Sequence, residues 1–167
     1  DRIPARNRTM PVTGDYAELA LLKSQLARIG SDGVKRVAKQ VGLECKALVA
    51  EGFSRGVSPS GQAWAPVRRG GQPLRDTGRL ASSITLNDTG AGFTVGTNVS
   101  YAAVHQYGAT IHAKGKRGLY SPKLRQFFGK TVTIPARPFL PEGDSLPATW
   151  ATRLDEAALD ALEAFFG

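Results

Sequence analysis

The sequence predicts an α+β fold in which helices at both ends of the chain flank a small, mostly antiparallel β-sheet. Apolar residues recur at spacings of three and four near both ends, which is typical of amphipathic helices. The middle of the chain instead carries short alternating runs bounded by glycines, which is typical of strands. Nineteen glycines and ten prolines in 167 residues indicate many turns and argue against a plain helical bundle.

The N-terminal part is predicted to hold an arm and two helices. Residues 1–14 are polar and basic, so we expect a flexible arm ahead of a single domain at 15–167. A first helix runs from Asp15 to Gly30. Ser31 and Asp32 then cap a second helix. The apolar stripe of this second helix consists of Val34, Val37, Val41, Cys45 and Leu48.

A long loop and a short helix are expected next. Residues 53–71 are rich in glycine and proline, which favours a loop. Asp76 and Thr77 are expected to cap one turn of helix that ends at Ser83. The alternating residues 84–86 and 93–96 then predict a β-hairpin.

The C-terminal half contains two strands and two helices by the same criteria. A short helix begins at a Ser100 cap and ends at Gly108, where a left-handed C-cap is expected. Residues 109–113 and 131–134 are predicted strands. A glycine-rich, basic and mobile loop, 114–130, is expected between them. The amphipathic pattern of residues 146–166 predicts the last helix, and the terminal helices are free to cover one face of the sheet.

The formal charge of +8 is unevenly distributed along the chain. Residues 1–63 carry a net +4, and residues 64–137 carry a net +9 from eleven basic and two acidic side chains. Residues 138–167 carry a net −5, with six acids against Arg153. A chain with a basic centre and an acidic tail is suited to a polyanion or to head-to-tail contact with its own copies.

No constellation of residues predicts an enzyme, a metal site or a cofactor. The two histidines, His105 and His112, lie in a region with no acidic residue between Asp88 and Glu142, whereas Zn²⁺ requires three or four ligands. Neither Ser100 nor Ser121 lies in a nucleophile elbow. The single cysteine excludes an internal disulfide, and no apolar run reaches the ~20 residues of a membrane span.

The basic loop has two interpretations. Its cations, interleaved with Tyr120, Phe127 and Phe128, suit a phosphate backbone and stacked bases. Alternatively, the loop contacts an acidic protein partner or is simply solvated. The residues concerned are Lys114, Lys116, Arg117, Lys123, Arg125 and Lys130.

Several punctuated motifs occur in one order along the chain. They are GQAWAP at 61–66, LRDTGRL at 74–80, SI at 83–84, VGTN at 95–98, YAAVHQYG at 101–108 and IPARPFL at 134–140. This ordered set resembles the phage virion morphogenesis family, also called the tail completion or tail-S family, of Mu-like and related tailed phages. The basic stretch 114–130 is longer than the family pattern and resembles a variable insertion.

The resemblance implies a non-enzymatic virion protein that completes the tail and joins it to the DNA-filled head. It implies a homo-oligomeric ring around the DNA channel, for which we favour a hexamer over a dodecamer. The implied neighbours are neck or connector proteins and tail terminator or tail tube proteins, with genomic DNA in the lumen and no membrane. The implied location is the head–tail interface or the head-proximal end of the tail, after assembly in the cytoplasm of the bacterial host.

Within this interpretation, six residues are predicted at subunit or partner interfaces: Trp64, Tyr101, His105, Tyr107, Arg137 and Phe139. Tyr101 and Tyr107 lie on different sides of a helix, so we expect one in the core and the other at an interface. Arg137, held extended between two prolines, is expected to fork onto a carboxylate such as one from the acidic helix of a neighbour. The alternative functions are a sequence-independent nucleic-acid-binding protein and, least favoured, a small hydrolase built on His105.

Overall fold

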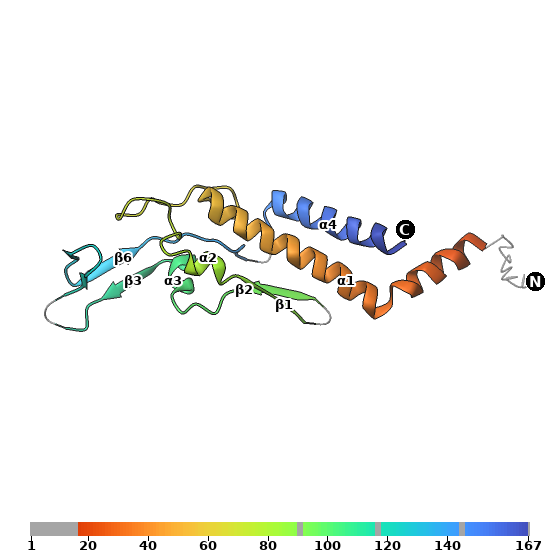
Figure 1. Ribbon diagram of the computed structural model, residues 1–167, viewed down its shortest axis with the longest axis horizontal. Coiled ribbons are helices and arrows are strands. Elements are labelled where there is room, and N and C mark those ends of the chain that lie inside the picture. Colours follow the sequence, from red (N-terminus) through yellow and green to blue (C-terminus); the bar gives the residue numbers. More distant parts are fainter. Residues whose placement is uncertain (1–16, 90–91, 116–117, 144–145, 167) are drawn as a thin grey trace, which may run out of the picture.

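The computed structural model describes residues 17–89, 92–115, 118–143 and 146–166, with side chains described from residue 32 onward. The predicted arm at 1–14 lies outside the described residues. The fold is α+β, as predicted, and is arranged in layers. Figure 1 shows the C-terminal helix α4 along one side of the long helix α1 and the strands along the other side.

Helix α1 (Ala17–Arg55) contains both predicted N-terminal helices. They meet at Gly30, whose backbone angles (φ 40°, ψ −163°) break the helical path and bend it. The helix continues to Arg55, so the prediction that a loop begins at Phe53 was wrong. Phe53 follows Val49 by one helical turn, and both side chains are almost fully buried, so core packing extends the helix.

Helix α4 (Ala148–Phe166) lies antiparallel to α1 and packs against it. Its Trp150 and Leu154 are buried, in agreement with the apolar face that the sequence predicts. Arg153 joins the two helices through ion pairs with Glu44 at 2.6 Å and Glu51 at 2.7 Å. The expectation that both terminal helices cover a sheet face was half wrong, because α1 contacts the strands and α4 packs on α1.

The first hairpin consists of β1 (Thr85–Asp88) and β2 (Phe93–Gly96), which pair antiparallel as predicted. It packs against α1 at Gly42, which is buried. A Cβ atom at this position would lie 2.6 Å from Leu86 Cδ1 and 2.9 Å from Phe93 Cγ. Glycine therefore sets how closely the hairpin approaches the helix.

Two further hairpins form a projection that we call the β-arm, described over residues 109–115 and 118–134. Strands β3 (Ala109–His112) and β6 (Thr131–Ile134) pair antiparallel, as do β4 (Tyr120–Ser121) and β5 (Gln126–Phe127). The prediction of one sheet was wrong: the strands of the described residues form three separate two-stranded sheets. Two-stranded hairpins are only marginally stable in isolation, so these hairpins depend on packing against helices and loops.

The segment predicted as a basic loop thus contains the hairpin of β4 and β5, and its mobility stays a prediction. Figure 1 shows the β-arm at one end of the long axis, far from the C-terminus of α4.

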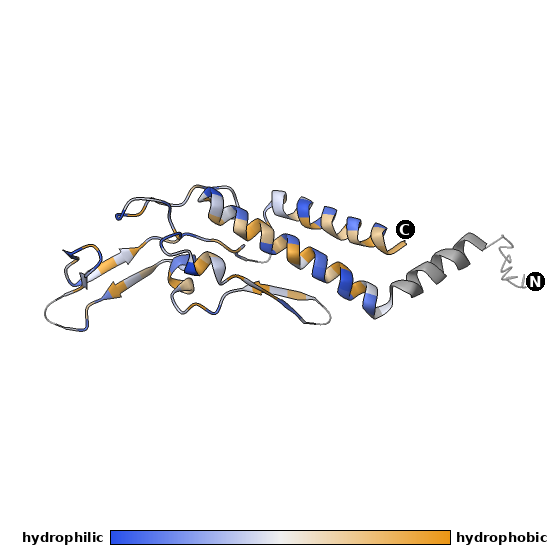
Figure 2. Ribbon diagram, in the orientation of Figure 1, coloured by the Kyte–Doolittle hydropathy of each residue, from blue (hydrophilic) through white to orange (hydrophobic). Residues whose placement is uncertain are grey.

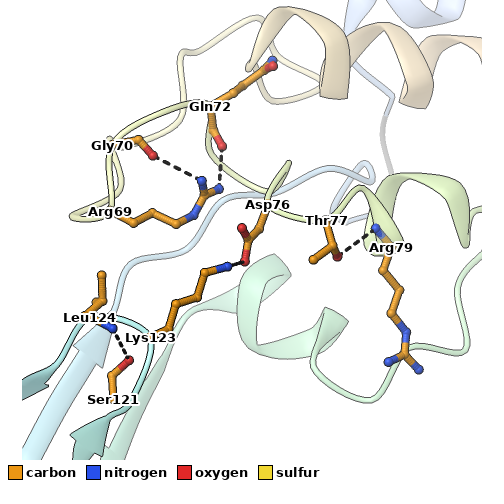
Figure 3. A network of polar contacts seen from close by, with 9 residues as sticks. All are labelled: Arg69, Gly70, Gln72, Asp76, Thr77, Arg79, Ser121, Lys123 and Leu124. Atoms are coloured by element: carbon orange, nitrogen blue, oxygen red, sulfur yellow. Dashed lines mark hydrogen bonds and ion pairs between the residues drawn. The ribbon is translucent and has the colours of Figure 1, made fainter.

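Two short helices connect these parts, and other residues than the predicted ones occupy their N-cap positions. Helix α2 (Arg79–Ser82) has Gly78, with φ 77°, at its N-cap, and Thr77, one residue earlier, accepts a hydrogen bond from the Arg79 nitrogen at 3.4 Å (Figure 3). Helix α3 (Ala102–Tyr107) has Tyr101 rather than Ser100 at its N-cap. Gly108 has the expected positive φ of 74°, but its ψ of 166° is extended and does not form a left-handed cap. A Cβ there would lie 2.9 Å from the Ala136 nitrogen, which explains the glycine.

The core lies where α1, α4 and the loops after α1 meet. Phe53 is at its centre, with its ring centroid 5.6 Å from that of Trp64 and 5.4 Å from that of Phe139. The buried apolar residues are Leu48, Val49, Phe53, Trp64, Leu80, Ile84, Ala102, Phe139, Trp150 and Leu154. Figure 2 shows the apolar side of α1 turned toward α4 and the strands.

Candidate subunit and partner interfaces

Two of the sequence motifs, GQAWAP and IPARPFL, meet in the interior. The Trp64 indole Nε1 donates to the Pro138 carbonyl oxygen at 2.7 Å. Arg137 donates from Nε to the Ala65 carbonyl oxygen at 2.8 Å and from Nη2 to the Pro66 carbonyl oxygen at 3.0 Å. Pro66 and Pro138 suit these bonds, because a proline has no backbone N–H and can offer only its carbonyl oxygen as an acceptor.

Gln106 joins a third motif, YAAVHQYG, to the same junction. Its Oε1 accepts from the backbone nitrogens of Phe139 and Leu140, both at 3.1 Å. Its Nε2 donates to the Leu140 carbonyl oxygen at 2.8 Å and to Glu142 Oε1 at 3.0 Å. Sequence reasoning missed this residue. Its position one helical turn after Ala102 could have indicated that Gln106 is buried, because both lie on the same face of α3.

Three of the six predicted interface residues belong to the interior of the single chain. Trp64, Arg137 and Phe139 are 7%, 5% and 3% exposed. The expected fork of Arg137 onto a carboxylate is corrected: its guanidinium binds backbone carbonyls of its own chain, and burial lowers its pKa. These three side chains stabilise the fold of one subunit.

The other predicted interface residues lie at the surface or close to it. Tyr107 is 71% exposed and Tyr101 37%, so the expectation that one of them is in the core was wrong. Tyr101 instead makes an edge contact with the half-buried ring of His105, with centroids 5.8 Å apart. An interface role for these residues stays a prediction.

His105 lines a pocket of ≈ 450 Å³ with Arg69, Asp76, Arg79 and Tyr101. Burial, and secondarily the charge of Arg137, lowers the pKa of His105, so its ring is neutral at pH 7. Its Nδ1 is buried without a hydrogen-bond partner among the described residues. No acid in the described part of the chain therefore orients this nitrogen, as a general base would require.

The β4–β5 hairpin of the β-arm is attached to the loop before α2. Lys123 forms an ion pair with Asp76, which lowers the pKa of that carboxyl group. Arg68 lies over the ring of Phe128, 5.5 Å from its centroid. Figure 3 shows the ion pair beside Arg69, which donates to the carbonyl oxygens of Gly70 at 3.2 Å and Gln72 at 2.9 Å. The attachment gives the β-arm a defined direction.

The exposed side chains of the β-arm include cations and aromatic rings. Lys114, Arg125 and Lys130 are exposed, and none of them forms an ion pair within the described residues. Lys116 and Arg117, which were also predicted to contact DNA or an acidic partner, lie outside the described residues. The rings of Tyr120 and Phe127 contact each other across β4 and β5, with centroids 4.7 Å apart and planes tilted by 43°.

The acidic surface lies on α4, on the opposite side of α1 from the strands. Its exposed carboxylates are those of Asp155, Glu156, Asp160 and Glu163. Hydrophilic residues line the side of α4 that is turned away from α1 (Figure 2). The charge split of the sequence thus becomes two separate surfaces on one molecule.

The described residues show neither a candidate metal site nor a candidate membrane-spanning helix. These residues contain no group of three or more His, Cys, Asp and Glu side chains placed to hold a metal ion. None of their helices combines the length and apolar character that crossing a bilayer requires.

Comparison with known proteins identifies the class to which this arrangement belongs. A family model for phage virion morphogenesis matches residues 17–146, which include all three motifs of the buried junction. The chain is thus one of the proteins through which phage particles are assembled. It belongs to the phage virion morphogenesis family.

One relative supports the same assignment over a shorter region. Mu-like prophage FluMu G protein 2 of Haemophilus influenzae is 41% identical over 96 residues. The match covers 57% of this chain and 56% of the relative, little more than half the length of each. No solved structure matches the chain.

Proposed function

We propose that the chain is a structural virion protein that completes the phage tail and joins it to the head. Membership of the virion morphogenesis family over residues 17–146 carries this proposal. A structural rather than catalytic role accords with the use of the GQAWAP, YAAVHQYG and IPARPFL motifs in a buried junction of hydrogen bonds.

The proposed working form is a homo-oligomeric ring around the DNA channel, with six copies matching the sixfold symmetry of tails and twelve as the alternative. The separation of a basic β-arm from an acidic α4 supports it, since unlike surfaces at different places on one chain suit cyclic contacts. The proposed neighbours are neck or connector proteins on one side and tail terminator or tail tube proteins on the other. Genomic DNA passes through the lumen, and the ring belongs to the head–tail interface of the virion.

Deleting the coding sequence from the phage or prophage tests this function. Lysates from the deletion should contain DNA-filled heads and tails that are not joined, and infectious titre should fall. Supplying the chain from a plasmid should restore joined particles. Normal numbers of joined, infectious virions after deletion would refute the proposal.

The second candidate is a sequence-independent nucleic-acid-binding protein. The exposed cations and aromatic residues of the β-arm favour it: Lys114, Tyr120, Arg125, Phe127 and Lys130. It predicts that the isolated chain binds duplex DNA with micromolar or tighter affinity and with a steep loss as salt rises. Titration of labelled DNA at several salt concentrations measures this, and absence of binding at low salt eliminates the candidate.

A further inference from the structure

The β4–β5 hairpin of the β-arm exposes apolar surface next to basic side chains. Phe127 is 65% exposed and Tyr120 49%, although the two rings contact each other. The turn between them is closed by a hydrogen bond from the Arg125 nitrogen to the Pro122 carbonyl oxygen at 3.3 Å. Lys123 is held by Asp76, while Arg125 and Lys130 remain exposed and outside any ion pair of the described residues.

The outer face of α4 has the complementary composition. Leu159 is 59% exposed in the middle of the helix. Asp155 precedes it by four residues and Glu163 follows it by four, so each lies one turn away on the same face. Glu156, three residues before Leu159, is on this face as well. An exposed leucine among carboxylates matches exposed aromatic rings among cations.

One chain cannot bring these two surfaces together. The β-arm lies at one end of the long axis, and α4 is covered on its inner face by α1 and extends toward the other end (Figure 1). The carboxylates of the outer face form no ion pair within the described residues, whereas the inner cation Arg153 is fully engaged with α1. Contact between the two surfaces therefore requires two molecules.

We propose that the exposed face of the β4–β5 hairpin of one copy docks on the outer face of α4 of the next copy. Tyr120 and Phe127 cover Leu159, and Arg125 and Lys130 face Glu156 and Glu163. Such a contact has an apolar centre and a polar rim, as specific interfaces do. It joins two different patches, so repeating it produces a closed ring or an open filament. This inference rests on the proposed ring and specifies the contact that builds it.

Paired charge reversals test the contact. The arm variant is R125E/K130E and the helix variant is E156K/E163K; all four positions are exposed, so the fold should persist. Sedimentation velocity over a range of concentrations measures self-association. Each variant alone should associate at least about tenfold more weakly than the wild type, because like charges then face each other. An equimolar mixture should recover wild-type association, since each reversed surface matches its counterpart.

The control K39E/K46E changes the net charge as much as the arm variant does, at exposed positions of α1 away from the contact. It should associate like the wild type. Normal association of either test variant, or no recovery in the mixture, would overturn the contact while leaving the virion role to the deletion experiment. A wild-type chain that stays monomeric at every concentration would also overturn it.

The same variants distinguish a second occupant of the β-arm. Duplex DNA binding is titrated in parallel with sedimentation. If R125E/K130E loses DNA binding while its self-association is unchanged, then the arm serves DNA and not the next subunit, and the proposal fails.

Discussion

Arg137 donates a hydrogen bond from Nε to the carbonyl oxygen of Ala65, 72 residues away in the sequence, at 2.8 Å. With its second bond to Pro66 and that of Trp64 to Pro138, it fastens the two proline-containing segments to each other. The arginine in the family-like motif is therefore a fold-stabilising residue of one subunit. This assignment separates it from the surfaces through which subunits meet.

Replacing Arg137 should destabilise the chain without altering the surfaces for assembly. Arg137→Met keeps the length but leaves the Ala65 and Pro66 carbonyls without their donors. We expect a loss of about 2–4 kcal/mol in the free energy of unfolding. Arg137→Lys should lose less, because one donor remains. Urea denaturation measures both; unchanged stability together with weaker self-association would contradict the assignment.

Gln106 should be equally important for stability although no sequence pattern singled it out. Gln106→Leu removes four hydrogen bonds at a buried site and should cost about 2–4 kcal/mol. The matched control is Gln126→Leu on exposed β5, where we expect a change within about 0.5 kcal/mol. Equal effects of the two substitutions in urea denaturation would show that Gln106 does not hold the junction.

Gly42 should not tolerate a methyl group. The Cβ of Gly42→Ala would lie 2.6 Å from Leu86 and 2.9 Å from Phe93, so the hairpin must move away from α1. Overpacking of about 1–3 kcal/mol should exceed the gain in helix propensity of about 1 kcal/mol. Gly96→Ala, with no atom within 4 Å of its Cβ, is the control and should have a smaller effect. A thermal midpoint for Gly42→Ala at or above that of the wild type would refute the close approach.

His105 should make stability fall as pH falls. Its pKa in the folded chain lies below the ordinary value of 6.5, mainly because of burial. Above that value both states are neutral, and stability is lost as pH falls toward the folded pKa, since the unfolded chain takes up the proton first. The pKa values of Glu51 and Asp76 are lowered from 4.5 and 3.8, so the stability that these carboxylates contribute is lost only at lower pH.

Unfolding free energies measured from about pH 7 to about pH 5 test this loss of stability, because the ordinary pKa of histidine lies between these pH values. His105→Asn should flatten the dependence, whereas His112→Asn, at the other histidine, should preserve it. An unchanged slope in His105→Asn would mean that another group is responsible.

The sequence predicted the elements better than it predicted what they contact. Helical and alternating periods located α1, α4, β1, β2, β3 and β6, because those periods follow from which face is buried. The predicted cap positions were wrong because Gly78 and Tyr101 occupy the N-caps of α2 and α3, although Thr77 still accepts a hydrogen bond from the Arg79 nitrogen. The separation into three small sheets depends on contacts between distant segments, which no local pattern encodes.

The candidate sites were predicted unevenly for a similar reason. The ordered motifs carry the family resemblance, which the family model confirms. However, core and interface select similar residues, so Trp64, Arg137 and Phe139 were assigned to an interface although they are buried. The β-arm was seen only as a charged loop, because its pairing and the Lys123–Asp76 attachment appear only in three dimensions.

The most direct test of the central claim is cryo-electron microscopy of the virions. We expect a ring of this chain at the head–tail interface or the head-proximal end of the tail, encircling the DNA channel, with sixfold symmetry favoured. Complete virions whose neck and tail contain no density for this chain would contradict it.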